Sequence, residues 1–234
     1  MTTRYLVAAV TCLILAGTQA LLAQDDEAER VRKAATVLEE IMKAPDKAIP
    51  DSVIKKAEAI AVFPGTLKGG FGVGAHHGRG ILSVRHREAG KWSNPAFLTI
   101  TGGSFGAQIG GEQIDLVLVI LNRSGVEKLL RNEFKIGGDA SVAAGPVGRQ
   151  TAASTDIQLT AEILSYSRAR GLFAGASLEG SSIREDEDAN RRYYGRPLSN
   201  RDITGIDGKV VGTSGATTKA ADTAWFAILD RYTK

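Results

Sequence analysis

The sequence predicts an α+β fold, in which a strongly curled, glycine-rich antiparallel sheet or barrel carries helices at its N- and C-terminal ends. Three observations predict it. Gly70, Gly72 and Gly74 alternate with larger residues, which gives the strand period of two with one face bare. Residues 115–121 are continuously apolar from Leu116 onward, which is typical of a buried central strand. Apolar residues recur at helical spacing near both ends of the chain.

Residues 1–23 have the features of a secretory signal peptide. Arg4 gives a positive start, and residues 6–17 form an apolar core that is too short to cross a bilayer. Cleavage is expected after Ala23, with Ala20 as the alternative. The pattern predicts a periplasmic or secreted protein that associates peripherally with a membrane.

The expected mature chain, residues 24–234, reads as a single domain because no linker rich in Ser or Pro divides it. Its stability must come from core burial, since the one cysteine, Cys12, lies in the signal core and fits a lipoprotein anchor poorly. Removing Arg4 lowers the formal net charge from +3 to +2 (3 − 1), too little to predict a nucleic-acid partner.

The first mature element is a predicted helix over residues 26–43, ended by Pro45. Its apolar face comprises Val31, Ala34, Ala35, Leu38, Ile41 and Met42. Basic and acidic residues are balanced on the other face, whereas a helix that lies on a membrane surface is rich in Lys and Arg there. Core packing is therefore favoured, with membrane contact as the alternative.

A second helix is expected to start near Asp51, which is a suitable cap. Residues 59–63 predict a short strand stopped by Pro64 and Gly65. Residues 70–86 predict a hairpin that reverses tightly at His76-His77-Gly78.

The following elements are predicted from turn residues and apolar runs. They are a turn at 88–90, a strand region at 95–108 notched by glycines, the buried strand at 115–121, a short helix that Ser124 can cap and that runs through Arg131, strands at about 161–169 and 171–180, a polar surface helix at 183–194, and turns over 198–215. The C-terminal helix has an apolar stripe of Ala221, Trp225, Ile228, Leu229 and Tyr232.

Two motifs with catalytic or calcium-binding counterparts read as structural. Gly102-x-Ser104-x-Gly106 matches a nucleophile elbow, but no helix is expected to follow and all three histidines precede the serine. Asp186-x-Asp188-x-Asn190 matches half of an EF-hand loop, but Arg191 and Pro197 occupy its sixth and twelfth places. We interpret the first motif as a glycine-notched strand and the second as a solvated helix face.

The sequence predicts no enzyme, no metal site and no cofactor. His76 and His77 read as a turn pair, since neighbours in a strand point to opposite faces. No nucleophile, base and orienting group can be assembled from the residues present.

Basic side chains gather around the predicted hairpin and at a later strand reversal. The candidate lipid-binding residues are Lys55, Lys56, Lys68, Arg79, Arg85, Arg168 and Arg170. Cations beside exposed backbone amides of a glycine-rich strand suit phosphate headgroups. The facing direction of Arg85 stays open, because strand alternation allows either side.

An ordered series of strings resembles the SYLF domain family. The strings occupy residues 57–64, 70–74, 78–84, 92–97, 101–106, 115–119, 138–148, 165–168, 171–175 and 193–195, so the resemblance covers about residues 30–198. It implies a non-enzymatic, lipid-binding domain, whose eukaryotic members bind phosphoinositides and act with actin at membranes. An amphipathic N-terminal segment helps membrane contact in those members, and residues 31–42 match it in amphipathicity.

The expected function is binding of anionic phospholipid headgroups at the envelope membrane. Phosphoinositides and actin are not expected as partners, because an exported chain meets neither inside its own cell. The alternative is a structural or scaffold protein of the periplasm or envelope that binds a protein partner. Salt separates the two, because headgroup binding weakens with ionic strength and an apolar protein interface does not.

Overall fold

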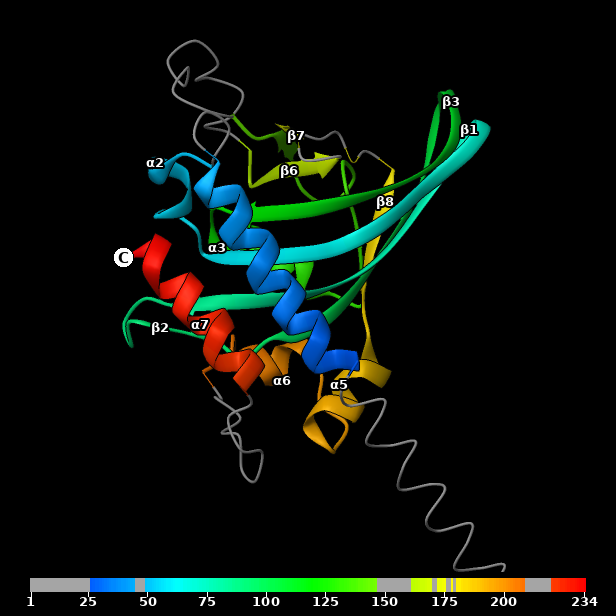
Figure 1. The fold of residues 1–234 in the computed structure, drawn as a ribbon. Coiled ribbons are helices and arrows are strands. Elements are labelled where there is room, and N and C mark those ends of the chain that lie inside the picture. Colours follow the sequence, from blue (N-terminus) through cyan, green and yellow to red (C-terminus); the bar gives the residue numbers. More distant parts are fainter. Residues whose placement is uncertain are drawn as a thin grey trace, which may run out of the picture.

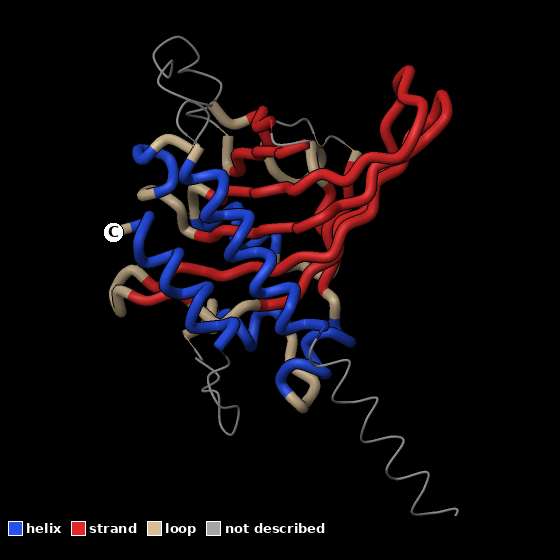
Figure 2. The backbone as a smooth tube through the Cα atoms, in the orientation of Figure 1, coloured by secondary structure: helices blue, strands red, loops and turns tan. Residues whose placement is uncertain are grey.

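The structure is a computed structural model that describes residues 26–44, 49–146, 161–169, 172–175, 178, 180–208 and 220–234. The expected signal peptide and Arg170 lie outside the described residues. The strands form one strongly curled sheet, and the two long helices cover one of its faces (Figure 2).

The sheet is built on a long two-stranded ribbon. Strand β1 (Ala59–His86) pairs antiparallel with β3 (Ala96–Ile120), from the Ala59–Ile120 pair to the Leu82–Ala96 pair. Figure 1 shows the two strands running together to a shared tip and returning. The predicted turn at 88–90 is confirmed as part of a turn at 87–90, after which β2 (Lys91–Trp92) pairs with the end of β1.

The other strands extend the two halves of this ribbon. The second half of β3 also pairs with β6 (Ile163–Ala169), which pairs parallel with β5 (Val142–Ala144) and antiparallel with β7 (Leu172–Gly175). The first half of β3 pairs with β8 (Ser181–Glu185), which pairs with β4 (Glu133–Lys135). The result is a curled, mainly antiparallel half-barrel with flanking helices, so the predicted fold class is confirmed.

The predicted hairpin at His76-His77-Gly78 is wrong. His76 pairs with Gly102 and His77 with Thr101, so β1 continues through these residues as a strand. The chain reverses earlier, between residues 69 and 75, because residues 67–69 and 75–77 line one pocket and Gly78 lies against Thr66. Because glycines in both strands remove side chains from the bend, two paired strands curve together and no tight turn is needed.

The predicted strand end at Pro64 and Gly65 is also wrong. The two residues form an irregularity, with a register shift between Phe63 and Thr66, and β1 then resumes. Gly65 has a φ of +60°, a conformation that favours glycine, and its N–H donates to Oδ1 of Asp115 at 2.8 Å. The predicted strands at 95–108 and 115–121 likewise belong to one strand, β3.

The two halves of β1 approach each other closely at Gly80. A Cβ at this position would collide with the carbonyl oxygen of Val62 and the ring of Phe63. Near the ends of the strand, the N–H of Arg85 donates to the carbonyl of Glu58 at 2.7 Å. At Gly80 the missing side chain therefore allows the close approach of another part of the backbone.

Both faces of the central strand are buried. Val117 and Val119 belong to the cluster packed under the helices, whereas Leu116, Leu118 and Ile120 belong to a second cluster on the opposite face. This double burial explains why the strand reads as a continuous apolar run instead of an alternating one.

The helix at residues 26–43 and α7 (Ala220–Thr233) lie side by side across the sheet (Figure 1). Val31, Ala34 and Leu38 are completely buried, so the apolar face packs in the core as favoured from the sequence. In α7, Nε1 of Trp225 donates to Oγ of Ser83 at 2.9 Å. Within the described residues, no helix is long and apolar enough to span a membrane.

Two predicted helix caps are wrong. Asp51 is the first residue of α2 (Asp51–Ile54), and Pro50 occupies the cap. Helix α3 (Arg123–Leu129) is capped by Asn122, whose side chain accepts from the Gly125 N–H at 2.8 Å, so Ser124 lies inside the helix. Asn122 follows the end of β3 almost directly, which places it at the first free N–H groups of the helix.

The region after residue 180 differs most from the prediction. Residues 183–185 belong to β8, and the helix, α5 (Glu187–Tyr194), begins only after its cap Asp186 and ends at Gly195 with a φ of +72°. The region predicted as turns contains α6 (Asn200–Thr204), whose capping box joins Ser199 and Asp202. Short elements fixed by caps leave a weaker periodic signal than long ones.

Candidate functional site

The predicted cations do not form one patch. Lys55, Lys56 and Arg85 lie together where α2, the end of β1 and β2 meet. Nη1 of Arg85 donates to the carbonyl of Lys55 at 2.9 Å, and Nη2 of Arg87 donates to the carbonyl of Lys56 at 3.0 Å. We call this region, with the exposed Lys91 of β2, the basic edge; its members are Lys55, Lys56, Arg85, Arg87 and Lys91.

Three lysines of the basic edge face solvent. Lys55, Lys56 and Lys91 are exposed, and among the described residues none has an acidic side chain within 4.0 Å. By contrast, Arg87 forms an ion pair with Glu58. The lysine ammonium groups are therefore the part of the edge that is available to an anionic surface.

Arg85 has a structural role within the basic edge. Besides the Lys55 carbonyl, its guanidinium donates to the carbonyl of Thr233 at 2.9 Å and lies 5.9 Å from the ring centroid of Trp92. Nε1 of Trp92 donates to Oγ1 of Thr233 at 3.2 Å. Arg85 therefore turns toward the protein and joins the ends of α2 and α7.

Lys68 lies elsewhere, beside a pocket of about 460 Å³ in the ribbon. The pocket is lined by residues 67–69 and 75–77 of β1 and by Glu112 and Gln113 of β3. Lys68 is the register partner of Glu112, and among the described residues it has no acidic partner within 4.0 Å. His76 and His77 line the same pocket from the strand, not from a turn.

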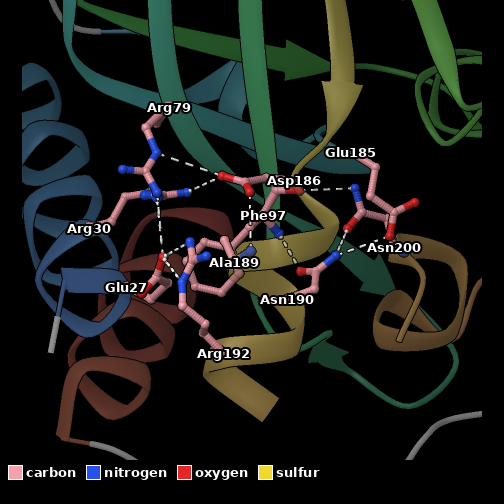
Figure 3. A network of polar contacts seen from close by, with 10 residues as sticks. All are labelled: Glu27, Arg30, Arg79, Phe97, Glu185, Asp186, Ala189, Asn190, Arg192 and Asn200. Carbon is pink, nitrogen blue, oxygen red and sulfur yellow. Dashed lines mark hydrogen bonds and ion pairs between the residues drawn. The ribbon is translucent and has the colours of Figure 1, made fainter. Parts of the chain in front are cut away.

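Arg79 belongs to an ion network around Glu27 (Figure 3). The Glu27 side chain is 1% exposed, and its Oε1 lies 3.5 Å from Arg30, 3.4 Å from Arg79 and 2.8 Å from Arg192. Asp186 pairs with Arg30 at 3.0 Å and approaches Arg79 at 3.7 Å. The pKa of Arg30 is lowered by its burial and by the neighbouring charge of Arg79. The carboxylates of Asp186 and Glu27 act in the opposite direction and stabilise the charged guanidinium.

Arg168 is also paired within the protein. Its guanidinium bonds Oδ2 of Asp115, from Nε at 2.8 Å and from Nη2 at 2.5 Å, and it forms an ion pair with Glu40. These contacts join β6 to β3 and to the N-terminal helix. Arg168 is therefore anchored to two acids.

The half EF-hand motif has a structural use. Asn190, expected on a solvated face, is completely buried; it accepts from the Phe97 N–H at 3.0 Å and donates to Asn200 Oδ1 at 2.8 Å. Glu185 accepts from Asn190 at 3.0 Å and from the Asn200 N–H at 2.7 Å (Figure 3). The solvated-face interpretation is wrong for Asn190, because this side chain joins α5 and α6 to β3.

Sequence reasoning missed the carboxylate at the centre of this network. Glu27 and Arg30 are three residues apart on one helix, a spacing that brings side chains together. That signal also fits a pair in solvent. Only the packing of Arg79 and Arg192 from distant elements shows that the pair is buried.

The catalytic and metal alternatives gain no support from the described residues. Residues 102–106 are strand, without the helix that a nucleophile elbow requires, and the Ser104 side chain lies outside what the structure describes. Within the described ranges, no three His, Cys, Asp or Glu residues group so as to hold a metal ion.

Comparisons with known proteins agree with the resemblance. The profile of the Ysc84 family, described as "Las17-binding protein actin regulator", matches residues 101–226. The chain is 39% identical over 171 residues to "SH3 domain-containing YSC84-like protein 1" of Xenopus laevis, with 70% of this chain and 50% of that protein covered. The human protein of the same name is 38% identical over 178 residues, with 74% and 52% covered.

A yeast protein, "LAS seventeen-binding protein 3" of Saccharomyces cerevisiae, is 36% identical over 174 residues, with 70% of this chain and 37% of that protein covered. The matched part thus spans about half the length of the vertebrate relatives and less of the yeast protein. The family profile matches more than half of the chain, from within β3 to the first half of α7. The chain therefore belongs to the Ysc84 family, as its resemblance to the SYLF domain predicted.

Proposed function

We propose that this domain is a non-enzymatic binding module that docks on anionic phospholipid at a membrane surface through the basic edge. The observation that carries the proposal is the group of exposed lysines, Lys55, Lys56 and Lys91, which have no acidic partner within 4.0 Å among the described residues. Each cation near an anionic membrane surface is worth on the order of 1 kcal/mol. Three such cations on one edge support weak, reversible attachment.

The other predicted cations have different parts in this proposal. Arg79 and Arg168 contribute less to the attraction because internal carboxylates already offset their charge. Arg85 supports the edge by fixing the ends of α2 and α7, and Lys68 would contact lipid at a separate place. Arg170 keeps its predicted role as a further headgroup contact, although it lies outside the described residues.

Co-sedimentation with vesicles tests the proposal. Vesicles of phosphatidylcholine with phosphatidylglycerol should bind the protein at low salt, and vesicles of phosphatidylcholine alone should not. At about 1 M salt, where the screening length is about 3 Å, binding should be lost. Equal binding to both vesicles, or binding that persists in high salt, would exclude the basic edge as the contact.

A second candidate function is binding of a protein partner. It is favoured by the description of the family as Las17-binding and by the name of the yeast relative. These names describe binding and regulation, which also supports a module without enzymatic activity. A protein interface that persists in high salt would favour this candidate over lipid binding.

We further propose that residues 1–23 direct export and are removed, so that the membrane in question belongs to the envelope and the mature domain spans 24–234. The charged start, apolar core and small residues at the cleavage position support this. Intact mass of the protein from fractionated cells tests it: a mature chain beginning at Gln24 is expected outside the inner membrane. A full-length chain in the cytoplasm would contradict it.

A further inference from the structure

The pocket in the ribbon brings together groups that suit a small anion. It has a volume of about 460 Å³ and is formed where residues 67–69 and 75–77 of β1 face each other beside Glu112 and Gln113. Leu67 at its rim is 57% exposed, the one large apolar side chain of the described residues that is mainly in solvent. An apolar rim beside a lysine suits a ligand at a membrane surface.

The charge of this pocket depends on its imidazoles. Lys68 and Glu112 supply one positive and one negative charge and are register partners across β1 and β3. His76 and His77 are the other titratable groups of the lining, and from β8 the neutral Ser181 contacts His76. With both imidazoles neutral the lining has no net charge, and each proton taken up adds one positive charge.

His76 is held in a defined orientation beside the backbone of β3. Its Nε2 lies 2.9 Å from Oγ of Ser181, and its ring occupies the space where a Cβ on Gly102 would lie. Among the described residues, no hydrogen-bond partner is found for Nδ1. Because Nε2 is engaged by the serine, Nδ1 is the ring nitrogen left to donate to a ligand when the imidazole is protonated.

The cationic form of His76 is disfavoured in the free protein. Burial is the first cause that lowers the pKa of His76, and the charge of Lys68 is the second. A bound anion would offset both effects, because it attracts Lys68 and the imidazolium at once. Anion binding and proton uptake must then favour each other by the same factor.

We propose that this pocket binds a tetrahedral phosphate group, supplied by a phosphomonoester lipid, and that binding strengthens as the pH falls because His76 becomes protonated. Lys68 and His76 are the cationic contacts, and Leu67 is the apolar contact to the lipid. The lipid as source rests on the proposed function, whereas binding of the bare anion does not.

Sulfate is the first probe, because it remains a dianion over the whole titration and so isolates the protein's own protons. The imidazole resonances of the chain are followed by NMR against pH, and the His76→Gln variant assigns the His76 signal. Saturating sulfate should raise the titration midpoint of His76 by about one unit, equivalent to tenfold tighter sulfate binding at low pH. An unchanged midpoint overturns the pocket.

Three variants locate the effect. Lys68→Ala should weaken sulfate binding at every pH, and His76→Gln should abolish the part of binding that depends on the protein's protonation. Lys91→Ala, in the basic edge, should leave sulfate binding unchanged. If Lys91→Ala weakens sulfate binding as much as Lys68→Ala does, the anion binds elsewhere and the inference is wrong.

The lipid source is tested with phosphatidylcholine vesicles that contain phosphatidic acid. The wild-type protein should bind them more tightly than the His76→Gln variant at about pH 5.5, and equally at about pH 7.5. Sulfate binding without this difference overturns the lipid source. If vesicle binding depends on Lys55 and Lys56 but sulfate leaves His76 unaffected, the proposed function stands and the pocket does not.

Discussion

Arg192 donates from Nη2 to Oε1 of Glu27 at 2.8 Å, which joins α5 to the first turn of the N-terminal helix. The same oxygen faces Arg30 and Arg79, at 3.5 Å and 3.4 Å. The helix that covers the sheet is therefore attached at its start by one buried carboxylate, shared among three guanidinium groups.

Replacing Glu27 by Gln should lower the free energy of unfolding by about 3 kcal/mol. The substitution keeps the shape of the side chain but leaves the arginines without their shared negative charge in a place that water does not reach. Urea unfolding, followed by circular dichroism, measures the change. Glu29→Gln is the matched control, since Glu29 is about half exposed beside Arg32 and should alter stability by less than about 0.5 kcal/mol. Equal effects at both positions would show that burial of Glu27 does not matter.

Replacing Lys55 and Lys56 together by Ala should weaken binding to anionic vesicles by roughly thirtyfold, from the loss of two exposed cations. The fold should persist, because neither side chain forms an ion pair within the described part of the chain. Vesicle co-sedimentation at low salt measures the loss. The control Lys33→Ala/Lys43→Ala removes two exposed cations of the N-terminal helix that pair with Glu29 and Glu39, and it should change binding little. A larger loss in the control would identify that helix as the membrane contact.

Replacing Gly80 by Ala should destabilise the protein by about 2 kcal/mol, because its Cβ would collide with the Val62 carbonyl where the halves of β1 meet. Thermal unfolding measures the effect. Gly103→Ala lies in the same ribbon and should cost less, since the nearest atom to its Cβ, the Gly74 carbonyl oxygen, is 3.8 Å away. Similar losses at both positions would contradict a close approach that is specific to Gly80.

Glu162 should contribute to the dependence of stability on pH. Its carboxylate accepts from Nζ of Lys128 at 2.7 Å and 3.0 Å, and this hydrogen bond is the first cause that lowers the pKa of Glu162. Because the pKa of Glu162 is lower in the folded protein, its ion pair with Lys128 stabilises the fold fully above the unfolded pKa of about 4.3. This stabilisation is lost as the pH falls through the folded pKa. Unfolding of the wild type and Glu162→Gln across this range should show a difference that shrinks toward acid pH. A constant difference would contradict the assignment.

Much of the fold could be predicted from the sequence. The long helices have apolar stripes, and the stripe of α7 is buried at Ala221, Trp225 and Leu229 as predicted. The glycine alternation correctly indicated a curled sheet. It misplaced the reversal, because alternating glycines are compatible both with a hairpin turn and with two paired strands that bend together.

The candidate site was less predictable. The sequence identified the cations but not their partners, so Lys55 and Arg79 looked alike. The structure leaves the Lys55 ammonium in solvent and places Arg79 beside Glu27 and Asp186. A cation with an internal partner has much of its attraction to a membrane already offset, and that partner is a residue far away in the chain.

The sequence by itself determined the fold class and the family, because apolar periodicity, glycine spacing and a long ordered series of motifs are properties of the chain read in order. Only the tertiary structure decided where the ribbon bends, which arginines are neutralised, and that His76 and Lys68 share a pocket. The physical reason is that charge and packing interactions act over a few ångströms in space. Residues as distant in sequence as Glu27 and Arg192 become neighbours only when the sheet has curled and the helices have packed on it.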